Sequence, residues 1–258
     1  MYKNEGPCPR IRSSLGQTWR MPQLATLDTV AEHLHTARMS TYMTAAMGDT
    51  GTAVALYLWN TRISAALYET LSITEVIFRN AVDEALKSWN PTRGNYPAEW
   101  TMKPAAPLNS LVSKALTVAK TNAATARSKR LPDHPRKHAP ITHDDIIAQL
   151  TFGTYARLMP TLNENDHAYD RRLILWHEAL EPAFRGRAGE DHRVHAGRVA
   201  RLHALRNRIA HAEPVLSVNF KARVRDMVRL VDSINPMLSG WVSGTTRVHD
   251  VLTQRPEF

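Results

Sequence analysis

An arginine and a histidine five positions apart, Arg206 and His211, have the clearest potential for chemistry in this sequence of 258 residues. A neutral imidazole can take the proton from a ribose 2′-hydroxyl, and a guanidinium group can neutralise charge on the phosphorane that forms when this oxygen attacks the neighbouring phosphorus. The products would be a 2′,3′-cyclic phosphate and a 5′-hydroxyl, and no metal or other cofactor would be needed. We therefore take both residues as candidate catalytic residues for RNA cleavage.

The spacing alone is a weak signal, because the sequence contains it four times. The other pairs are Arg172 with His177, Arg187 with His192 and Arg198 with His203. Context separates Arg206 and His211 from these, since Asn207 directly follows the arginine and Pro214 ends the expected helix. On a helix Asn207 and His211 share a face, so the amide would orient the imidazole as a third candidate catalytic group.

Arg206 lies about 140° around a helix from His211, so one cleft can contact both only if it straddles the helix. A second copy of the chain, related by symmetry, would create such a cleft. The alternative is that His211 is an ordinary helix cap or a hydrogen-bonded core residue, with no catalytic role.

Arginines are dense just before this pair, and within the dense stretch only Glu190 and Asp191 offset them. The arginines are Arg185, Arg187, Arg193, Arg198, Arg201, Arg206 and Arg208. Together with a net charge of +9, they favour a polyanionic partner, with RNA phosphates following this track. A basic loop with Lys129, Arg130, Arg136 and Lys137 would extend the track. The alternative is a basic, solvated surface with no nucleic acid bound.

Composition favours a folded protein, with 43% hydrophobic and 22% charged residues. Cys8 is the single cysteine, so an internal disulfide and a cysteine-based zinc site are excluded, and a reducing cytoplasm is the expected location. The first residues lack the apolar core of a signal peptide, and the apolar run from Ala53 is too short to span a bilayer. We expect no contact with a membrane.

The apolar spacing is helical throughout and no stretch alternates with period two, which predicts an all-α bundle of eight or nine helices. Expected helices cover residues 24–47, 52–89 with a break near Ser72, 108–127, 142–159 with Thr142 as N-cap, 166–180, 194–212, 217–239 and 246–252. We divide the chain into an irregular leader (1–22), N-terminal helices (23–90), a loop, connecting helix and basic loop (91–140) and a C-terminal helical part (141–258). We expect one composite domain.

Three stretches of the sequence resemble one family. "LRNRIAHAEP" is similar to the Arg-x4-6-His signature of HEPN-domain ribonucleases, in the form found in the abortive-infection (Abi-like) proteins of bacteria. "LYLWNTRISAALYETLSITEVIFRNAVDEAL", which contains Glu75, Arg79 and Asn80, and "DDIIAQLTFGTYARL" are similar to the same family, in the family's order. The three stretches together comprise 56 of the 258 residues.

The resemblance implies a HEPN-like fold, metal-independent RNA cleavage, a homodimer with facing signatures, and a role in phage defence or as the toxin of a toxin–antitoxin pair. An antitoxin, protein or RNA, would then be a further partner. The family's common second histidine is replaced here by Ala212, which leaves Glu213 as the nearest polar group. This departure puts an auxiliary base in doubt.

Other residues are candidates for support of the site or for RNA contacts. They are Glu75, Arg79, Asn80, Arg201, His203, Arg208 and Glu213. The first three could equally form a buried network of ion pairs and amides that supports the helix of Arg206. Two further functions stay open for the whole chain: a non-catalytic RNA- or DNA-binding regulator, and a helical scaffold of a defence complex.

Overall fold

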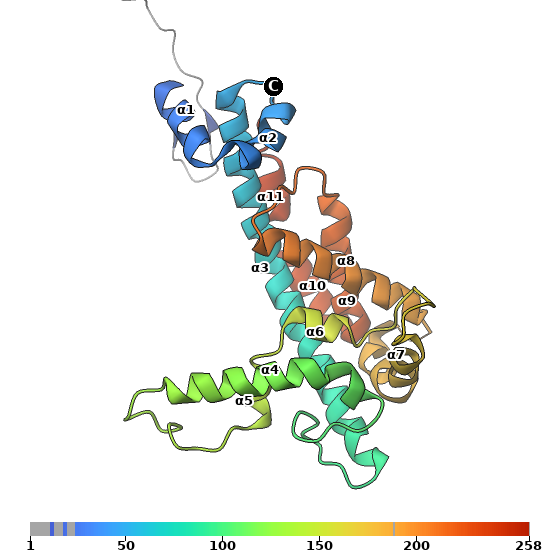
Figure 1. The fold of residues 1–258 in the computed structure, drawn as a ribbon. Coiled ribbons are helices and arrows are strands. Elements are labelled where there is room, and N and C mark those ends of the chain that lie inside the picture. Colours follow the sequence, from blue (N-terminus) through green and yellow to red (C-terminus); the bar gives the residue numbers. More distant parts are fainter. Residues whose placement is uncertain (1–10, 13–17, 20–23, 188, 258) are drawn as a thin grey trace, which may run out of the picture. The chain divides into compact units, whose positions relative to one another are not determined.

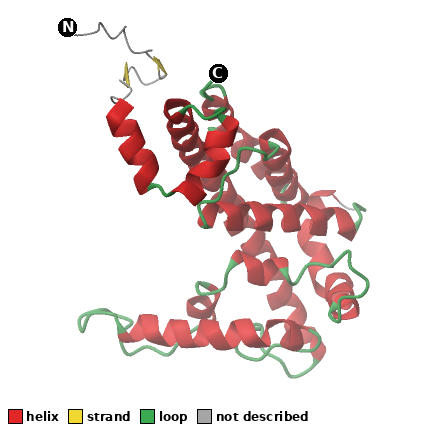
Figure 2. Ribbon diagram, turned by 45° about the horizontal axis from the view of Figure 1, so that its top comes forward, coloured by secondary structure: helices red, strands yellow, loops and turns green. Residues whose placement is uncertain are grey.

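The computed structural model of the protein describes residues 11–12, 18–19, 24–187 and 189–257. Almost every regular element among them is helical (Figure 1, Figure 2), so the predicted all-α class is confirmed. The exception is one antiparallel pair of two-residue strands, β1 (Ile11–Arg12) and β2 (Thr18–Trp19). This pair falls in the expected leader, most of which, Cys8 included, lies outside the described residues. None of the described helices is long and apolar enough to cross a membrane.

The chain divides into two compact units. Unit 1 takes in the described residues up to Tyr68, Arg208–Val218 and those from Thr246 onward, and unit 2 takes in Glu69–Asn207 and Asn219–Thr245. Two helices, α3 (Thr50–Trp89) and α8 (His192–Ala210), contribute residues to both units.

Unit 1 contains α1 (Leu24–His33), α2 (Thr36–Ala45), α11 (Val248–Leu252) and the first turns of α3. The single helix predicted for 24–47 is wrong, because the chain turns at His35, whose φ is 69°. The core is formed by Leu27, Met39, Tyr42, Ala46, Ala53, Val54 and Leu56. Later segments are fastened to α3 by hydrogen bonds, since Trp59 Nε1 donates to the Val251 carbonyl and Asn60 Oδ1 accepts from the Val215 amide.

Unit 2 contains the remainder of α3 and the helices between it and the C-terminal segment. These are η1 (Asn90–Arg93), α4 (Leu108–Ser128), α5 (His143–Ile147), α6 (Phe152–Ala156), α7 (Tyr169–Leu175), a π-helical turn η2 (Trp176–Leu180), a 3-10 segment η3 (Glu181–Arg187), most of α8, α9 (Phe220–Ile234) and α10 (Pro236–Thr245). At its core the Phe78 ring of α3 meets the rings of Phe152 and Phe184, with centroids 5.8 and 6.4 Å away.

Helix α3 is continuous over 40 residues, so the break predicted near Ser72 is wrong. Hydroxyl residues in this region need not interrupt a helix when they bond to a carbonyl one turn earlier. Thr74 does so, because its Oγ1 donates to the carbonyl of Thr70 at 2.9 Å.

The Thr142 cap is confirmed, but the long helix predicted after it is wrong. Thr142 and Asp145 form a capping box, in which each side chain bonds to the other's backbone amide. The helix then stops at Ile147, and α6 begins only at Phe152. The backbone amide of Thr142, together with Arg130 and Arg136, lowers the pKa of Asp145 to about 2.

This carboxylate also fixes the basic loop that follows α4. Arg130 and Arg136 form ion pairs with Asp145 at 3.1 and 2.6 Å, and the Lys137 ammonium donates to backbone carbonyls of Ser128 and Arg130. The loop charges that we expect to extend an RNA track are therefore held, in large part, by contacts within the protein.

Candidate functional site

Helix α8 ends one residue before His211. Arg206 and Asn207 lie in its last turns and belong to unit 2, whereas His211 follows the helix and belongs to unit 1. Helix α8 thus ends at Ala210, two residues earlier than expected. The Asn207 amide instead lies 3.2 Å from Nε2 of His203, so the imidazole that it orients is the one four residues earlier on the helix.

The end of α8 has a regular geometry that exposes His211. The amide of Ala212 donates to the carbonyl of Ile209, and the amide of Glu213 donates to the carbonyl of Arg208. This pattern is the Schellman motif, in which the position occupied here by Ala212 adopts a left-handed conformation. Ala212 has a φ of 51°, and its carbonyl accepts a 2.7 Å hydrogen bond from Arg38. His211 is exposed at this turn.

Ala212 occupies a conformation that costs an L-residue about 1 kcal/mol and costs glycine almost nothing. The variant Ala212→Gly is therefore expected to raise the free energy of unfolding by about 0.5–1 kcal/mol, measured by urea denaturation. A loss of stability would show that this turn is not left-handed in solution.

Arg206 is partly buried and lacks the partner that an arginine in such a place usually has. Its Nε is buried without a hydrogen-bond partner, and no described residue accepts a hydrogen bond from its guanidinium group or forms an ion pair with it. A partly buried cation without a counter-ion is costly in a protein that is not bound to an anion. The site thus presents an uncompensated positive charge.

The other arginines at this end of the chain are mostly neutralised by carboxylates. Arg198 pairs with Glu190, Arg201 with Asp226, Arg208 with Glu213 and Arg187 with Asp232. Asp226, Asp232 and Glu213 lie outside the arginine-rich stretch, so sequence inspection of that stretch overstates its free charge. Arg201 and Arg208 are therefore engaged in ion pairs, and the unpaired Arg206 differs from both.

Glu75, Arg79 and Asn80 lie in the unit 2 part of α3 and have different surroundings. Arg79 donates to the Ile147 carbonyl at 2.8 Å and its guanidinium lies 5.4 Å from the centre of the Tyr155 ring. Burial raises the pKa of the Tyr155 hydroxyl to about 12, and the charge of Glu75 adds to this effect while Arg79 opposes it. Asn80 is exposed. Arg79 thus connects α3 to α5 and α6, which is a structural contact.

A buried polar network, absent from the sequence predictions, joins three segments of unit 2. Asp83 Oδ1 accepts from Trp100 Nε1 at 2.8 Å and from His143 Nε2 at 2.9 Å, and Nδ1 of His143 lies 2.8 Å from Thr101 Oγ1. The order Thr–His–Asp is that of a nucleophilic triad. Thr101 is completely buried, so substrate has no access, and the network fastens the 100–103 loop and α5 to α3.

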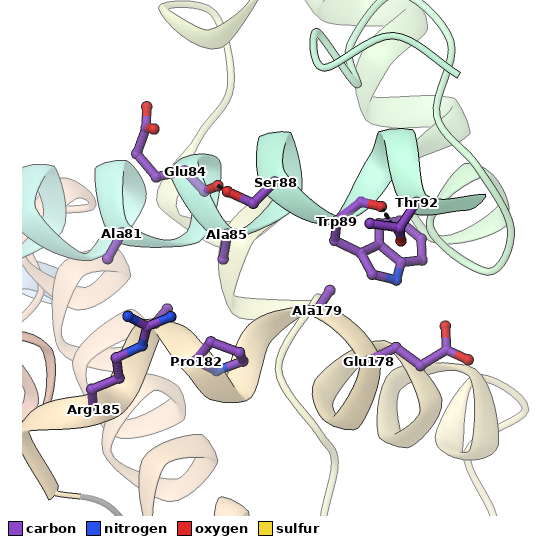
Figure 3. A pocket seen from close by; sticks show the side chains of 11 residues that line it. Ala81, Glu84, Ala85, Ser88, Trp89, Thr92, Glu178, Ala179, Pro182 and Arg185 are labelled. Atoms are coloured by element: carbon purple, nitrogen blue, oxygen red, sulfur yellow. Dashed lines mark hydrogen bonds between the residues drawn. The ribbon is translucent and has the colours of Figure 1, made fainter. Parts of the chain in front are cut away.

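One groove of unit 2 is lined largely by small apolar side chains (Figure 3). It has a volume of about 500 Å³ and lies between α3 and the segment formed by η2 and η3. Its lining residues are Ala81, Glu84, Ala85, Ser88, Trp89, Thr92, Glu178, Ala179, Pro182, Ala183 and Arg185. Small apolar side chains face one another across it. In the described part of the chain, no cluster of three or more His, Cys, Asp or Glu residues could hold a metal ion.

Comparisons of the chain with models of protein families, with curated proteins and with solved structures found no match. The described residues form an all-α protein in which Arg206, near the end of a basic helix, has no side-chain partner among them, and in which His211, directly after that helix, is exposed.

Proposed function

We propose that the protein is a metal-independent endoribonuclease of HEPN type, in which Arg206 and His211 act on a phosphodiester of RNA. The observation that carries this proposal is the unpaired guanidinium group of Arg206 five residues before an exposed histidine. Most neighbouring arginines have carboxylate partners, so Arg206 stands out as the residue free to bind an anion.

The chemistry follows from these two side chains. His211 takes the proton of the ribose 2′-hydroxyl as the bond from this oxygen to phosphorus forms, and the bond from phosphorus to the 5′-oxygen breaks. The guanidinium group of Arg206 stabilises the negative charge on the phosphorane, the leaving 5′-oxygen takes up a proton from water, and His211 releases its proton to solvent afterwards. The products are a 2′,3′-cyclic phosphate and a 5′-hydroxyl.

The resemblance to abortive-infection proteins adds a biological setting to this proposal. A homodimer would bring two copies of the signature together, and cleavage of cellular RNA would act in phage defence or as a toxin held in check by an antitoxin. The exposed position of His211 is compatible with a site shared between two copies of the chain.

Incubation of the purified protein with total RNA in excess EDTA tests this function. We expect fragments that end in a 2′,3′-cyclic phosphate and begin with a 5′-hydroxyl, identified by end-specific ligation and mass spectrometry. Intact RNA under these conditions, or fragments with 5′-phosphate ends, would contradict the proposal.

One observation favours a second function, a regulator that binds RNA without cleaving it. Asn207 orients His203, and within unit 1 no described side chain forms a hydrogen bond to the ring of His211. A general base is usually held by such a partner. A regulator would show binding that weakens steeply with salt and would leave the RNA uncut.

A further inference from the structure

The imidazole of His203, on α8, lies in a closely fitted position within unit 2. Its ring meets the Phe152 ring edge to face, with centroids 5.9 Å apart. A Cβ atom at Gly153 would lie 2.8 Å from Nε2 of His203, a distance that real side chains do not tolerate. Any side chain at Gly153 would therefore displace the ring, so the backbone of α6 fixes where this imidazole sits.

The side-chain amide of Asn207 contacts one ring nitrogen of His203, since its Nδ2 lies 3.2 Å from Nε2. In the tautomer in which Nε2 accepts from this amide, the neutral imidazole carries its hydrogen on Nδ1. His203 therefore offers one N–H donor in its neutral form, and it can gain positive charge only by a second protonation.

Two arginines lie on the helix faces that meet at His203, because Arg206 is three residues after it on α8 and Arg157 is four residues after Gly153, at the end of α6. Burial lowers the pKa of His203, and the guanidinium groups of Arg157, directly after α6, and Arg206, on α8, lower it further. Both charged groups that act on this imidazole are cations, and no carboxylate of the described residues is among the causes of the shift. Positive charge on this imidazole is therefore disfavoured while no anion is bound.

Neither guanidinium group has a partner of its own in the described part of the chain. Arg157 is exposed and Arg206 partly buried, and neither forms an ion pair or a side-chain hydrogen bond with a described residue. By contrast, Arg198 and Arg201 of α8 each bond a carboxylate through two nitrogens. Two guanidinium groups without a partner among the described residues, together with an N–H donor, are the groups that bind an oxyanion in proteins.

We propose that Arg157, Arg206 and His203 form a phosphate-binding site, and that a phosphate group of an RNA strand occupies it. The assignment of this site to RNA rests on the proposed function. Its binding of a phosphate anion is independent of that function. A bound anion favours the charged form of the imidazole, so phosphate binding takes up a proton at His203.

The probe for this site is inorganic phosphate, followed through the ring nitrogens of His203 by NMR on the full-length protein. We expect a saturable change of the His203 signals, an increase of its pKa on binding, and tighter binding as the pH is lowered. The variants Arg157→Gln and Arg206→Gln are each expected to weaken binding about tenfold, because each removes a charge-assisted hydrogen bond.

The matched control is Arg225→Gln, which removes the same charge from an exposed position on α9 and should leave binding unchanged. Gly153→Ala should displace the ring and abolish the link between binding and the charge of His203, while the rest of the spectrum stays that of a folded protein. Absence of a phosphate-dependent change at His203, or equal weakening in all three glutamine variants, would overturn the site.

A second measurement tests whether the phosphate group that binds at this site comes from RNA. An RNA oligonucleotide with 2′-O-methyl groups cannot be cleaved by 2′-hydroxyl attack, so its competition with inorganic phosphate reports binding alone. Competition supports the assignment to RNA, and its absence overturns that assignment while the anion site stands. Neither experiment measures cleavage. A protein that binds phosphate but leaves RNA intact would therefore contradict the proposed endoribonuclease function and leave the phosphate-binding site supported.

Discussion

Replacing His211 with alanine is expected to reduce the rate of RNA cleavage by a factor of about 10²–10⁴, the contribution that a positioned general base makes. The residue is exposed and follows the last residue of α8, so its removal should leave stability within about 0.5 kcal/mol of the original protein. Initial rates in EDTA, together with circular dichroism and urea unfolding, measure both effects.

His249 is the matched control, because it is an exposed histidine in the same unit, on α11. The variant His249→Ala should cleave RNA at the original rate. If His211→Ala and His249→Ala were equally active, His211 could not be the general base. His211 would then be an ordinary residue at the end of a helix, with no catalytic role.

A double variant tests whether Arg206 and His211 act together. Side chains that serve one chemical step contribute non-additively, so the loss caused by both changes should be close to the larger of the single losses. Arg206→Ala alone is expected to lower the rate by about 10²–10³, as for other groups that stabilise charge in the transition state. Effects that simply multiply would indicate two separate roles.

Much of the fold could be predicted from the sequence because its signals are local. The helical spacing of apolar residues predicts the all-α class, and α4 has the bounds expected for it to within one residue. Thr142 followed by acidic residues predicts a cap, and the capping box is present. Each of these features depends on residues within one or two turns of one another.

Features that depend on distant residues could not be predicted in the same way. Arg201 meets Asp226 from another helix, and Asp83 meets Trp100 and His143 across loops whose course no local pattern reveals. The same holds for the site, where Arg206 and His211 follow from a motif. Arg157 lies far from both in sequence and affects His203 only through the packing of α6 on α8.

The buried network around Asp83 gives the largest expected effect on stability. Replacing Asp83 with alanine leaves the buried N–H groups of Trp100 and His143 without their common acceptor. A buried donor without a partner costs about 1–3 kcal/mol, and breaking a buried ionic network costs about 3–5 kcal/mol. We therefore expect Asp83→Ala to lower the free energy of unfolding by about 3 kcal/mol or more in urea denaturation.

Glu84 provides the control for this variant, since it neighbours Asp83 and also pairs with Lys87 but is exposed on the surface of α3. Exposed pairs contribute little, so Glu84→Ala should change stability by less than about 1 kcal/mol. Similar losses in the two variants would show that Asp83 acts as one more surface charge and that the network does not hold the 100–103 loop and α5 on α3.

The pH dependence of stability should distinguish the contribution of the ionised Asp83 carboxylate from the contribution of the side chain's shape. Burial disfavours the ionised form of Asp83, but hydrogen bonds from His143, Trp100 and Lys87 outweigh it and lower the pKa below the usual 3.8. The ionised group therefore stabilises the fold above this pH, and its contribution is lost as the pH falls through the lowered pKa. In Asp83→Asn, which keeps the shape and one acceptor, this part of the acid-induced loss should be missing, because the variant has no proton to gain there.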